Sequence, residues 1–427
     1  MRQREWPRRP FVLDAGFYLV SGLFAGATAV FSEFYGYRIW GALAGLAYLA
    51  GLIQALVLLS GKARPATTRI GRALASRFMP VWLTAGLGMI VPLVVLLIRR
   101  VQGVPWSEQP EVWVIEQSAT RLLHSGSPYL DLATLGRPPI VDDYTPYGVA
   151  MSVFGIPRAL FGDSVLTDAR VAFGAASVLI VLVALRVLGW PKVPPRAAQL
   201  ILACPLTTLT FAVAGDDLVI VALILLALAL LHRRRPVLCG AAIAVAVSIK
   251  LTASPALIVL AVAVSGMLGL RSLLRFCAAV LGVGVIVTVP VMLVDPHNFI
   301  EQVIKFPLGI GQAHSPAQSP LPGVLIGQLG PAGHDAAIAL MCAAALGIGC
   351  WLLIRPPRRA SDAALRSAIG LGLAIMLSPA TRYGYLVYPL ALFGAAITLR
   401  AMENQDEPVL IDTGSAAEQR LEVGEAA

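Results

Sequence analysis

Acidic and aromatic residues gather in one segment of an otherwise apolar chain. The stretch from Glu111 to Tyr129 carries two glutamates, Glu111 and Glu116, and the pair Asp142-Asp143 follows it. A carboxylate can take a proton from a hydroxyl group as a general base, and aromatic rings can stack on a ligand. We therefore expect the chemistry of this protein to lie in this segment and in the elements that position it.

The rest of the chain is dominated by hydrophobic residues. They make up 57% of the sequence, whereas only 13% of the residues are charged, a composition typical of membrane proteins. The apolar runs are continuous and lack the alternation of barrel strands, which predicts an all-α polytopic membrane protein. The predicted bundle has about twelve transmembrane helices, near 11–31, 38–60, 81–98, 171–189, 197–214, 217–231, 237–249, 253–267, 275–294, 336–354, 364–378 and 384–400.

Lysine and arginine residues predict the orientation, because they are enriched on the cytoplasmic side of membrane proteins. Twelve crossings put every basic cluster on one side and both termini in the cytoplasm. The long connections at about 99–170 and 295–335 then lie on the outer face of the plasma membrane. The net charge of +9 is explained by this topology and by anionic lipid, and no nucleic-acid partner is expected. The clusters are Arg2 to Arg9, Lys62 to Arg77, Arg186 to Arg196, Arg233 to Arg235, Arg271 with Arg275, and Arg355 to Arg366.

Three parts are predicted along the chain. Residues 1–79 form an N-terminal extension of two membrane helices, and residues 80–402 form the transmembrane catalytic core. Residues 403–427 are acidic and too polar to bury a core, so a disordered cytoplasmic tail is expected. All five cysteines lie in apolar runs, so no disulfide framework is indicated. The histidines lack the spacing of zinc ligands, and no zinc site is expected.

Four short motifs follow one another along the chain. The first is Leu122-Leu123-His-Ser-Gly126-Ser-Pro128-Tyr129, and the second is Tyr144-Thr-Pro146 at the start of an apolar run. The third runs from Gly215-Asp216-Asp217 to Lys250-Leu-Thr-Ala-Ser-Pro255, and the fourth is Ser378-Pro379-Ala-Thr-Arg382-Tyr-Gly-Tyr385. In this order the motifs resemble the GT-C superfamily of membrane glycosyltransferases, closest to family 87 and its actinobacterial mannosyl- and arabinosyltransferase relatives. The double Asp departs from the family, which more often has Gly-Gln or Gly-Asn there.

The resemblance implies a function. Such enzymes transfer a sugar, here mannose or arabinofuranose, from a polyprenyl phosphate to a hydroxyl of a lipid-linked or polysaccharide acceptor, with inversion at the anomeric carbon. One carboxylate acts as general base, and fixed positive charge stabilises the departing phosphate. Family spacing places the base at or near Glu111, with Glu116 as its rival. Lys250, Arg382 and Arg121 are the predicted phosphate ligands.

Lys250 is also favoured by helix length. The runs 237–249 and 253–267 are each only about 20 Å long at 1.5 Å per residue, so a hairpin of the two would end near the headgroups, where a polyprenyl phosphate lies. The alternative is one long helix kinked at Pro255, with Lys250 paired inside the membrane.

Other residues have both a functional and a structural interpretation. Asp143 could supply the carboxylate or, with Asp142, bind Mg²⁺ or Mn²⁺, although no metal is required by the predicted chemistry. A role in a loop turn is the alternative. Tyr129 and Tyr144 could stack on the sugar or belong to an interfacial aromatic belt. Asp216 and Asp217 could contact the substrate or cap a helix.

Two other classes of protein fit the composition. A transporter or flippase of a lipid-linked or small polar substrate would also have many helices and intramembrane charges, but it should show two similar halves, which the sequence lacks. A non-catalytic assembly subunit that retains the fold is the other alternative.

Overall fold

The apolar runs fold as helices because a backbone in hydrocarbon must satisfy its hydrogen bonds within its own segment. A computed structural model describes residues 9–60, 68–307, 311–313 and 316–406. Within these ranges the chain forms helices and no strand, apart from one isolated bridge between Gln318 and Thr381. Each of the twelve predicted runs falls on one helix or on two consecutive ones, so the prediction of an all-α polytopic membrane protein is confirmed.

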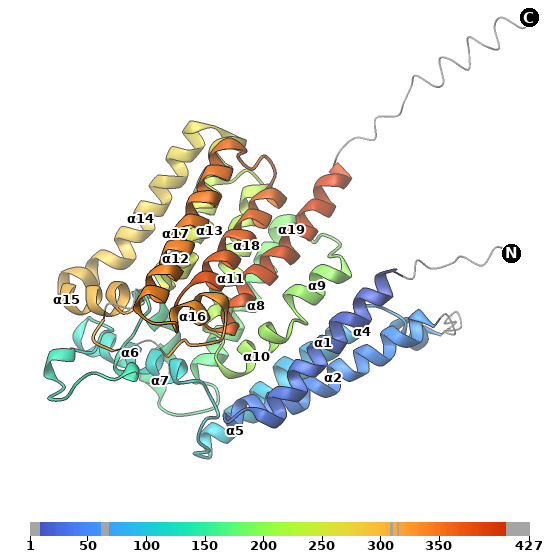
Figure 1. The fold of residues 1–427 in the computed structure, drawn as a ribbon, viewed down its shortest axis with the longest axis horizontal. Coiled ribbons are helices and arrows are strands. Elements are labelled where there is room, and N and C mark those ends of the chain that lie inside the picture. Colours follow the sequence, from blue (N-terminus) through green and yellow to red (C-terminus); the bar gives the residue numbers. More distant parts are fainter. Residues whose placement is uncertain (1–8, 61–67, 308–310, 314–315, 407–427) are drawn as a thin grey trace, which may run out of the picture.

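Most of the bundle consists of long apolar helices (Figure 1). Ten spans in the described residues are long and apolar enough to cross a membrane, whereas α11 and α12 are shorter. The bundle helices are α1 (Arg9–Phe31), α2 (Tyr35–Leu59), α4 (Met79–Ala85) continuing through a π-helical turn into α5 (Val91–Val101), α8 (Ala169–Leu188), α9 (Pro195–Ile201), α10 (Pro205–Val213), α11 (Asp216–His232), α12 (Pro236–Ile249), α13 (Ser254–Leu268), α14 (Leu270–Val294), α17 (Pro331–Ile354), α18 (Ala360–Leu377) and α19 (Val387–Asp406).

Shorter elements lie between these helices. Helices α6, α7 and α15 lie together at one end of the bundle (Figure 1), where they cover the ends of the longer helices. Five short helices belong to this group or to loops: α3 (Arg69–Leu74), α6 (Pro110–Ser125), α7 (Ile156–Phe161), α15 (Pro296–Phe299) and α16 (Pro322–Gly327).

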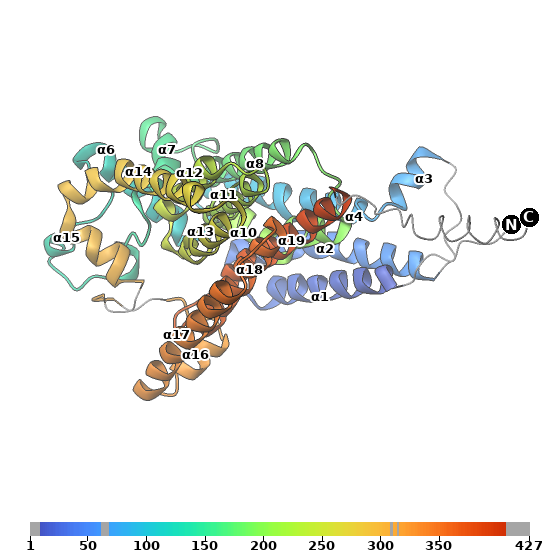
Figure 2. The same ribbon diagram turned by 90° about the horizontal axis from the view of Figure 1, so that it is seen from above.

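Helix α11 forms the centre of the core. It is apolar on every side below its first turn, and a helix of that kind is stable only when it is surrounded. Helices α8, α12, α18 and α19 pack around it and bury nearly all of its side chains. In contrast, α14 and α17 leave large apolar residues exposed, such as Ile286 and Leu353, and Figure 2 shows α17 at the edge of the bundle. These exposed faces are suited to contact with lipid.

Helices α12 and α13 form a hairpin. Lys250 takes an extended backbone conformation that ends α12, and Pro255 lies in the first turn of α13. Helix α13 leads through Gly269 directly into α14. Phe276, near the start of α14, lies against Gly240, near the start of α12, so the end of α13 lies close to the start of α12. The chain therefore reverses at Lys250, and the alternative of one long helix kinked at Pro255 is wrong.

The basic clusters of the described residues lie at one end of the bundle. Glu403 at the end of α19 accepts a hydrogen bond from the Ser361 amide (3.1 Å) and lies 3.8 Å from His232. Arg233 donates to the Leu188 carbonyl (2.7 Å), which brings the ends of α8 and α11 together. We call this the basic end, and we call the opposite end, which holds Lys250 and Arg382, the site end.

Helix α19 runs through Glu403 to Asp406, so the segment predicted as a tail begins within a helix. Several residues used in the sequence analysis lie outside the described ranges: Arg2, Arg4, Arg8, Lys62, Arg64 and residues 407–427.

The N-terminal helices α1 and α2 pack against each other and against α4, α5 and α10 (Figure 1). At the basic end, buried Asp14 accepts from Arg77 Nε (2.6 Å) and from Gln199 Nε2 (3.0 Å), and it lies 3.3 Å from Arg196 Nη2. A carboxylate removed from water needs such partners. This cluster fixes α1 to the helices that follow.

Candidate functional site

Helix α6 carries both predicted bases, and its start is tied to the bundle. The Gln109 amide donates to the Val213 carbonyl at the end of α10 (3.0 Å), and Pro110 begins the helix. Proline suits the first turn because its missing N–H would have no partner there. The Glu111 side chain is therefore in the first turn of α6, close to the first turn of α11.

Glu111 forms an ion pair with Arg382, which lies 271 residues further along the chain. Thr381, next to Arg382, is held by the 317–319 segment, since its amide donates to the Ala317 carbonyl (2.8 Å). Burial lowers the pKa of Arg382, but the Glu111 carboxylate outweighs it, and the net shift is upward. Only one Glu111 oxygen is used: Oε2 is buried and has no hydrogen-bond partner in the described part of the chain.

Lys250 lies near this pair, because Tyr385 interacts electrostatically with Lys250, Arg382 and Glu111, and it is paired with the two aspartates that begin α11. Asp217 Oδ1 accepts from Lys250 Nζ (2.7 Å) and from the Tyr388 hydroxyl (2.6 Å), and Asp216 lies 3.7 Å from the same ammonium. Both aspartates are in the first turn of α11, where the helix dipole favours negative charge. Asp216 and Asp217 are thus charge partners of Lys250, and Gly215 occupies the N-cap position.

Two aromatic rings complete the cluster. Lys250 Nζ lies 4.7 Å from the ring centroid of Tyr385 and 5.5 Å from that of Tyr147. Rings at this distance attract a cation through their electron-rich faces. We define the site cluster as Glu111, Arg382, Lys250, Asp216 and Asp217 with the rings of Tyr147, Tyr385 and Tyr388.

Glu116 is a buried carboxylate in a network of arginines. Its Oε1 accepts from Arg100 Nη1 (2.9 Å) and from the Ala169 amide (3.0 Å), and its Oε2 accepts from Arg100 Nη2 (2.6 Å), with Arg158 Nε at 3.3 Å. Both oxygens are therefore occupied. Of the two predicted bases, only Glu111 has an oxygen available for a substrate hydroxyl.

The same network includes Asp168, at the N-cap of α8. It accepts from Arg100 Nη1 (2.6 Å) and from Arg170 Nη2 (2.8 Å), and all three side chains are largely buried. Burial raises the pKa of Asp168, but the two guanidinium groups outweigh it and lower the value to about 2. Helices α5, α6, α7 and α8 are joined through these charges.

Asp143 belongs to a loop turn. Its carboxylate accepts from Arg137 Nη1 (2.6 Å) and Nη2 (2.8 Å) and from the Ile140 amide (2.8 Å). The Arg137 hydrogen bond is the main cause of its lowered pKa. These bonds support the structural interpretation and leave Asp143 poorly placed to act as a base.

Arg121 does not join the site cluster. It lies ten residues after Glu111 on α6, about 15 Å along the helix at 1.5 Å per residue. Its electrostatic neighbour is Asp143. A phosphate held by Lys250 and Arg382 would therefore be out of reach of Arg121.

Tyr129 and Tyr144 are covered by protein. The Tyr129 hydroxyl donates to the Tyr147 carbonyl (3.1 Å), and its ring packs edge-on against Phe299. Tyr144 stacks on Phe306 with ring centroids 4.3 Å apart. Neither ring offers a free face to a sugar in this structure.

The acidic side chains of the described residues are dispersed or paired with basic groups. No group of three or more His, Cys, Asp or Glu residues in the described ranges is arranged to hold an ion. Asp142 and Asp143 fit an ion poorly because Arg137 already holds the Asp143 carboxylate. The use of Mg²⁺ or Mn²⁺ stays a prediction.

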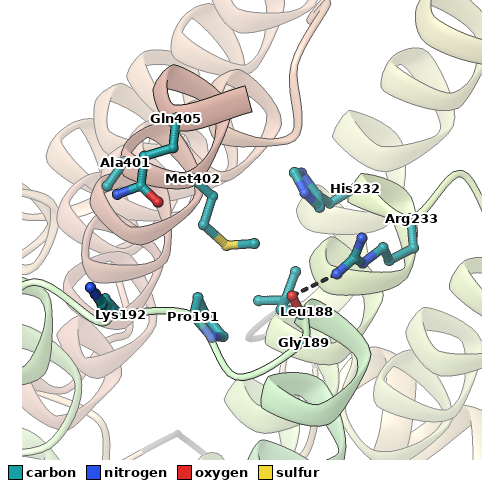
Figure 3. A pocket seen from close by; sticks show the side chains of 9 residues that line it. All are labelled: Leu188, Gly189, Pro191, Lys192, His232, Arg233, Ala401, Met402 and Gln405. Atoms are coloured by element: carbon teal, nitrogen blue, oxygen red, sulfur yellow. Dashed lines mark hydrogen bonds between the residues drawn. The ribbon is translucent and has the colours of Figure 1, made fainter. Parts of the chain in front are cut away.

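A cavity of about 220 Å³ lies at the basic end (Figure 3), and no residue of the site cluster lines it. It is lined by the ends of α8, α11 and α19. Arg233 points to the end of α8 and donates to the Val187 and Leu188 carbonyls. Since its charged groups serve helix ends, we do not assign the chemistry to this cavity.

Sequence reasoning missed several residues of the cluster and its supports. Tyr385 belongs to the fourth motif but was given no role, and it lies in the turn before α19. Tyr388 lies in the first turn of α19. Their closeness in sequence to Arg382, a predicted phosphate ligand, was a usable signal. Arg100, Asp168 and Arg170 gave no such signal, because nothing in the sequence shows that Arg100 meets both Glu116 and Asp168, or that Arg170 lies buried beside Asp168.

Comparison with known proteins gives one result. The family model of glycosyltransferase family 87 matches residues 144–379, more than half of the chain. Tyr147, Asp216, Asp217 and Lys250 lie inside this range, whereas Glu111 and Arg382 lie outside it. No curated protein and no solved structure matches the chain. With its membrane bundle and its family match, the chain belongs to glycosyltransferase family 87.

Proposed function

We propose that this glycosyltransferase moves a sugar from a polyprenyl phosphate to a hydroxyl of a lipid-linked or polysaccharide acceptor. Mannose and arabinofuranose are the sugars that the sequence motifs favour. The observation that carries the proposal is the buried Oε2 of Glu111, which has no hydrogen-bond partner among the described residues and lies on a carboxylate paired with Arg382, with Lys250 in the same cluster. A base next to fixed positive charge is what transfer from a phosphate requires.

In the proposed reaction the acceptor oxygen attacks the anomeric carbon from the face opposite the phosphate. Glu111 Oε2 takes the hydroxyl proton while the new carbon–oxygen bond forms. The bond between the anomeric carbon and the phosphate oxygen breaks, and polyprenyl phosphate leaves with the electron pair. One displacement inverts the anomeric centre, and no second carboxyl acid is needed because the phosphate leaves as a stable anion.

Arg382 is the better placed of the two phosphate ligands. Its side chain is 33% exposed, against 11% for Lys250, and a guanidinium has five N–H donors, enough to bind a carboxylate and a phosphate together. The site cluster holds three carboxylates and two cations. An arriving phosphate therefore competes with Glu111 for Arg382, and this competition would free the carboxylate to act as a base.

The proposed location follows from the charge distribution. The site end lies opposite the basic end, and basic residues favour the cytoplasmic side. We propose that the chain resides in the plasma membrane with its site cluster on the outer face and both termini in the cytoplasm. Polyprenyl-phosphate sugars carry their phosphate at the headgroup level, near the Lys250 tip of the α12–α13 hairpin.

A transfer assay tests this function. Purified full-length protein receives radiolabelled polyprenyl-phosphate mannose or arabinose and lipid acceptors, with and without Mg²⁺. We expect Glu111→Gln to lower turnover by about 10²- to 10⁴-fold, the contribution of a general base, while binding of labelled donor is retained. Glu116→Gln is the matched control on the same helix, and its folded fraction should turn over at a rate close to that of the wild type.

Two results would count against the proposal. Wild-type turnover in the Glu111→Gln variant would show that Glu111 is not the base. Absence of transfer from every donor, together with movement of labelled lipid across vesicles, would favour the transporter alternative.

A further inference from the structure

The N-terminal helix α2 contacts the segment that leads into α6. The Gly36 amide donates to the Trp106 carbonyl (2.9 Å), and the Phe34 ring lies 5.2 Å from the Trp106 ring. A Cβ added to Gly36 would lie only 3.1 Å from the Trp106 oxygen. The first turn of α2 thus lies directly against residues 104–109.

Tyr37 extends this contact to the start of α6. Gln109 Nε2 donates to the Tyr37 hydroxyl, while the Gln109 amide donates to Val213 of α10. Gln109 is the N-cap residue of α6, and Glu111 is two residues further on. Gln109 therefore links α2, α6 and α10 at the helix start that carries the side chain of the proposed base.

The Tyr37 hydroxyl is also close enough to Glu111, Arg382 and Asp216 to interact with them electrostatically. Its oxygen accepts from Gln109, and in the described residues its own O–H hydrogen has no acceptor. Tyr37 lies outside the range matched by the family model. The contact is thus supplied by a part of this chain that the family match does not cover.

We infer that Tyr37 is a positioning residue for Glu111, acting through its hydrogen bond with Gln109 at the start of α6. The inference rests on the proposed function, because it takes Glu111 as the base. The general reason is that catalytic groups need to be held to within a fraction of an ångström by surrounding hydrogen bonds. Helices α1 and α2 would then contribute to the reaction geometry as well as to membrane anchoring.

The test is a double-mutant cycle in the full chain. Tyr37→Phe removes only the hydroxyl and keeps the ring, and Gln109→Ala removes the donor. Each should lower kcat by about three- to tenfold, the effect of one hydrogen bond, with the KM for the donor changed by less than about twofold. The double variant should be no slower than the slower single variant. Tyr35→Phe, in the same turn of α2, is the control and should keep wild-type kcat.

A wild-type kcat in Tyr37→Phe, or effects that multiply in the double variant, would overturn the inference. If Glu111→Gln retains activity, Glu111 is not the base, and the proposed function fails separately from the contact made by Tyr37. Hydrogen exchange of residues 107–114 supplies a readout without turnover. Faster exchange in Tyr37→Phe than in Tyr35→Phe supports the inference even if the wild type transfers no sugar, and equal exchange in that case overturns it.

Discussion

Glu111 and Glu116 lie on one helix but have opposite surroundings. Glu116 has two guanidinium groups and a backbone amide on its two oxygens, whereas Glu111 has one partner and one unused oxygen. A carboxylate whose acceptor sites are filled gains nothing by taking a proton, since it would lose those bonds. The number of free acceptor positions therefore distinguishes the proposed base from the structural acid.

Lys250 combines a structural role with its proposed function, and a charge-compensating pair of variants separates the two. We expect Lys250→Met to lower the free energy of unfolding by about 3–5 kcal/mol, because it leaves Asp217 buried without its cation. Lys250→Met combined with Asp217→Asn should recover most of that loss. Thermal unfolding in detergent measures the stability of both variants.

The transfer assay then tests the functional role of Lys250. Both variants should bind the donor weakly and transfer little sugar, because neither has the ammonium. Full activity in the double variant would mean that Lys250 does not contact the donor phosphate.

At the scale of elements, α6 is fixed at two points. Its first turn is held through Gln109, and Glu116 in its middle is held by Arg100 of α5, Arg158 of α7 and the start of α8. Its apolar face, with Val112 and Ile115, also packs into the core. The ion network therefore fixes the middle of α6 to the bundle, whereas Gln109 holds the turn that carries Glu111.

The charge network makes stability depend on pH. The pKa of Asp168 is lowered from 3.8 to about 2, so its ion pairs contribute stability that is complete above pH 4 and lost as the pH falls from about 4 to 2. We expect Asp168→Asn to lower the free energy of unfolding by about 3–5 kcal/mol at pH 6. The difference from the wild type should shrink towards pH 2. Thermal unfolding from pH 2 to 6 measures it, and a constant difference would show that the carboxylate charge is not the cause.

The α12–α13 hairpin shows how an element places a single residue. Helix α12 is too short to cross the hydrocarbon core, which takes about 20 residues, so the chain reverses at Lys250 where other helices surround it. The beginning of α11 meets it there with Asp216 and Asp217. The short helices α11 and α12 are tolerated because other helices surround them.

At the scale of the whole molecule, the N-terminal helices are attached at both ends. Asp14 joins α1 to Arg77, Arg196 and Gln199 at the basic end, and Tyr37 joins α2 to Gln109 at the site end. The prediction that residues 1–79 form a separate extension is not tested by the family match, which begins at residue 144.

The two attachments should have different effects. We expect Asp14→Asn to lower the free energy of unfolding by about 1–3 kcal/mol, because Arg77 and Arg196 lose a charged acceptor. Its kcat should change by less than about twofold, since the cluster lies at the opposite end from Glu111. Thermal unfolding and the transfer assay measure the two quantities. A large loss of kcat at unchanged stability would contradict this division between the ends.

The sequence by itself determined the all-α membrane bundle and its helices, because hydrophobic run length and the need to satisfy backbone hydrogen bonds in lipid are local properties. It favoured a reversal at Lys250 but left one long kinked helix open. It also indicated the acids and cations from which the site could be built. Only the tertiary structure decided which of them meet. Arg382 reaches Glu111 across 271 residues and Tyr388 reaches Asp217 across 171, and Phe299 and Phe306 cover the tyrosines predicted to bind sugar. Such contacts depend on how the helices pack against one another, and local sequence patterns do not show which distant helices will be neighbours.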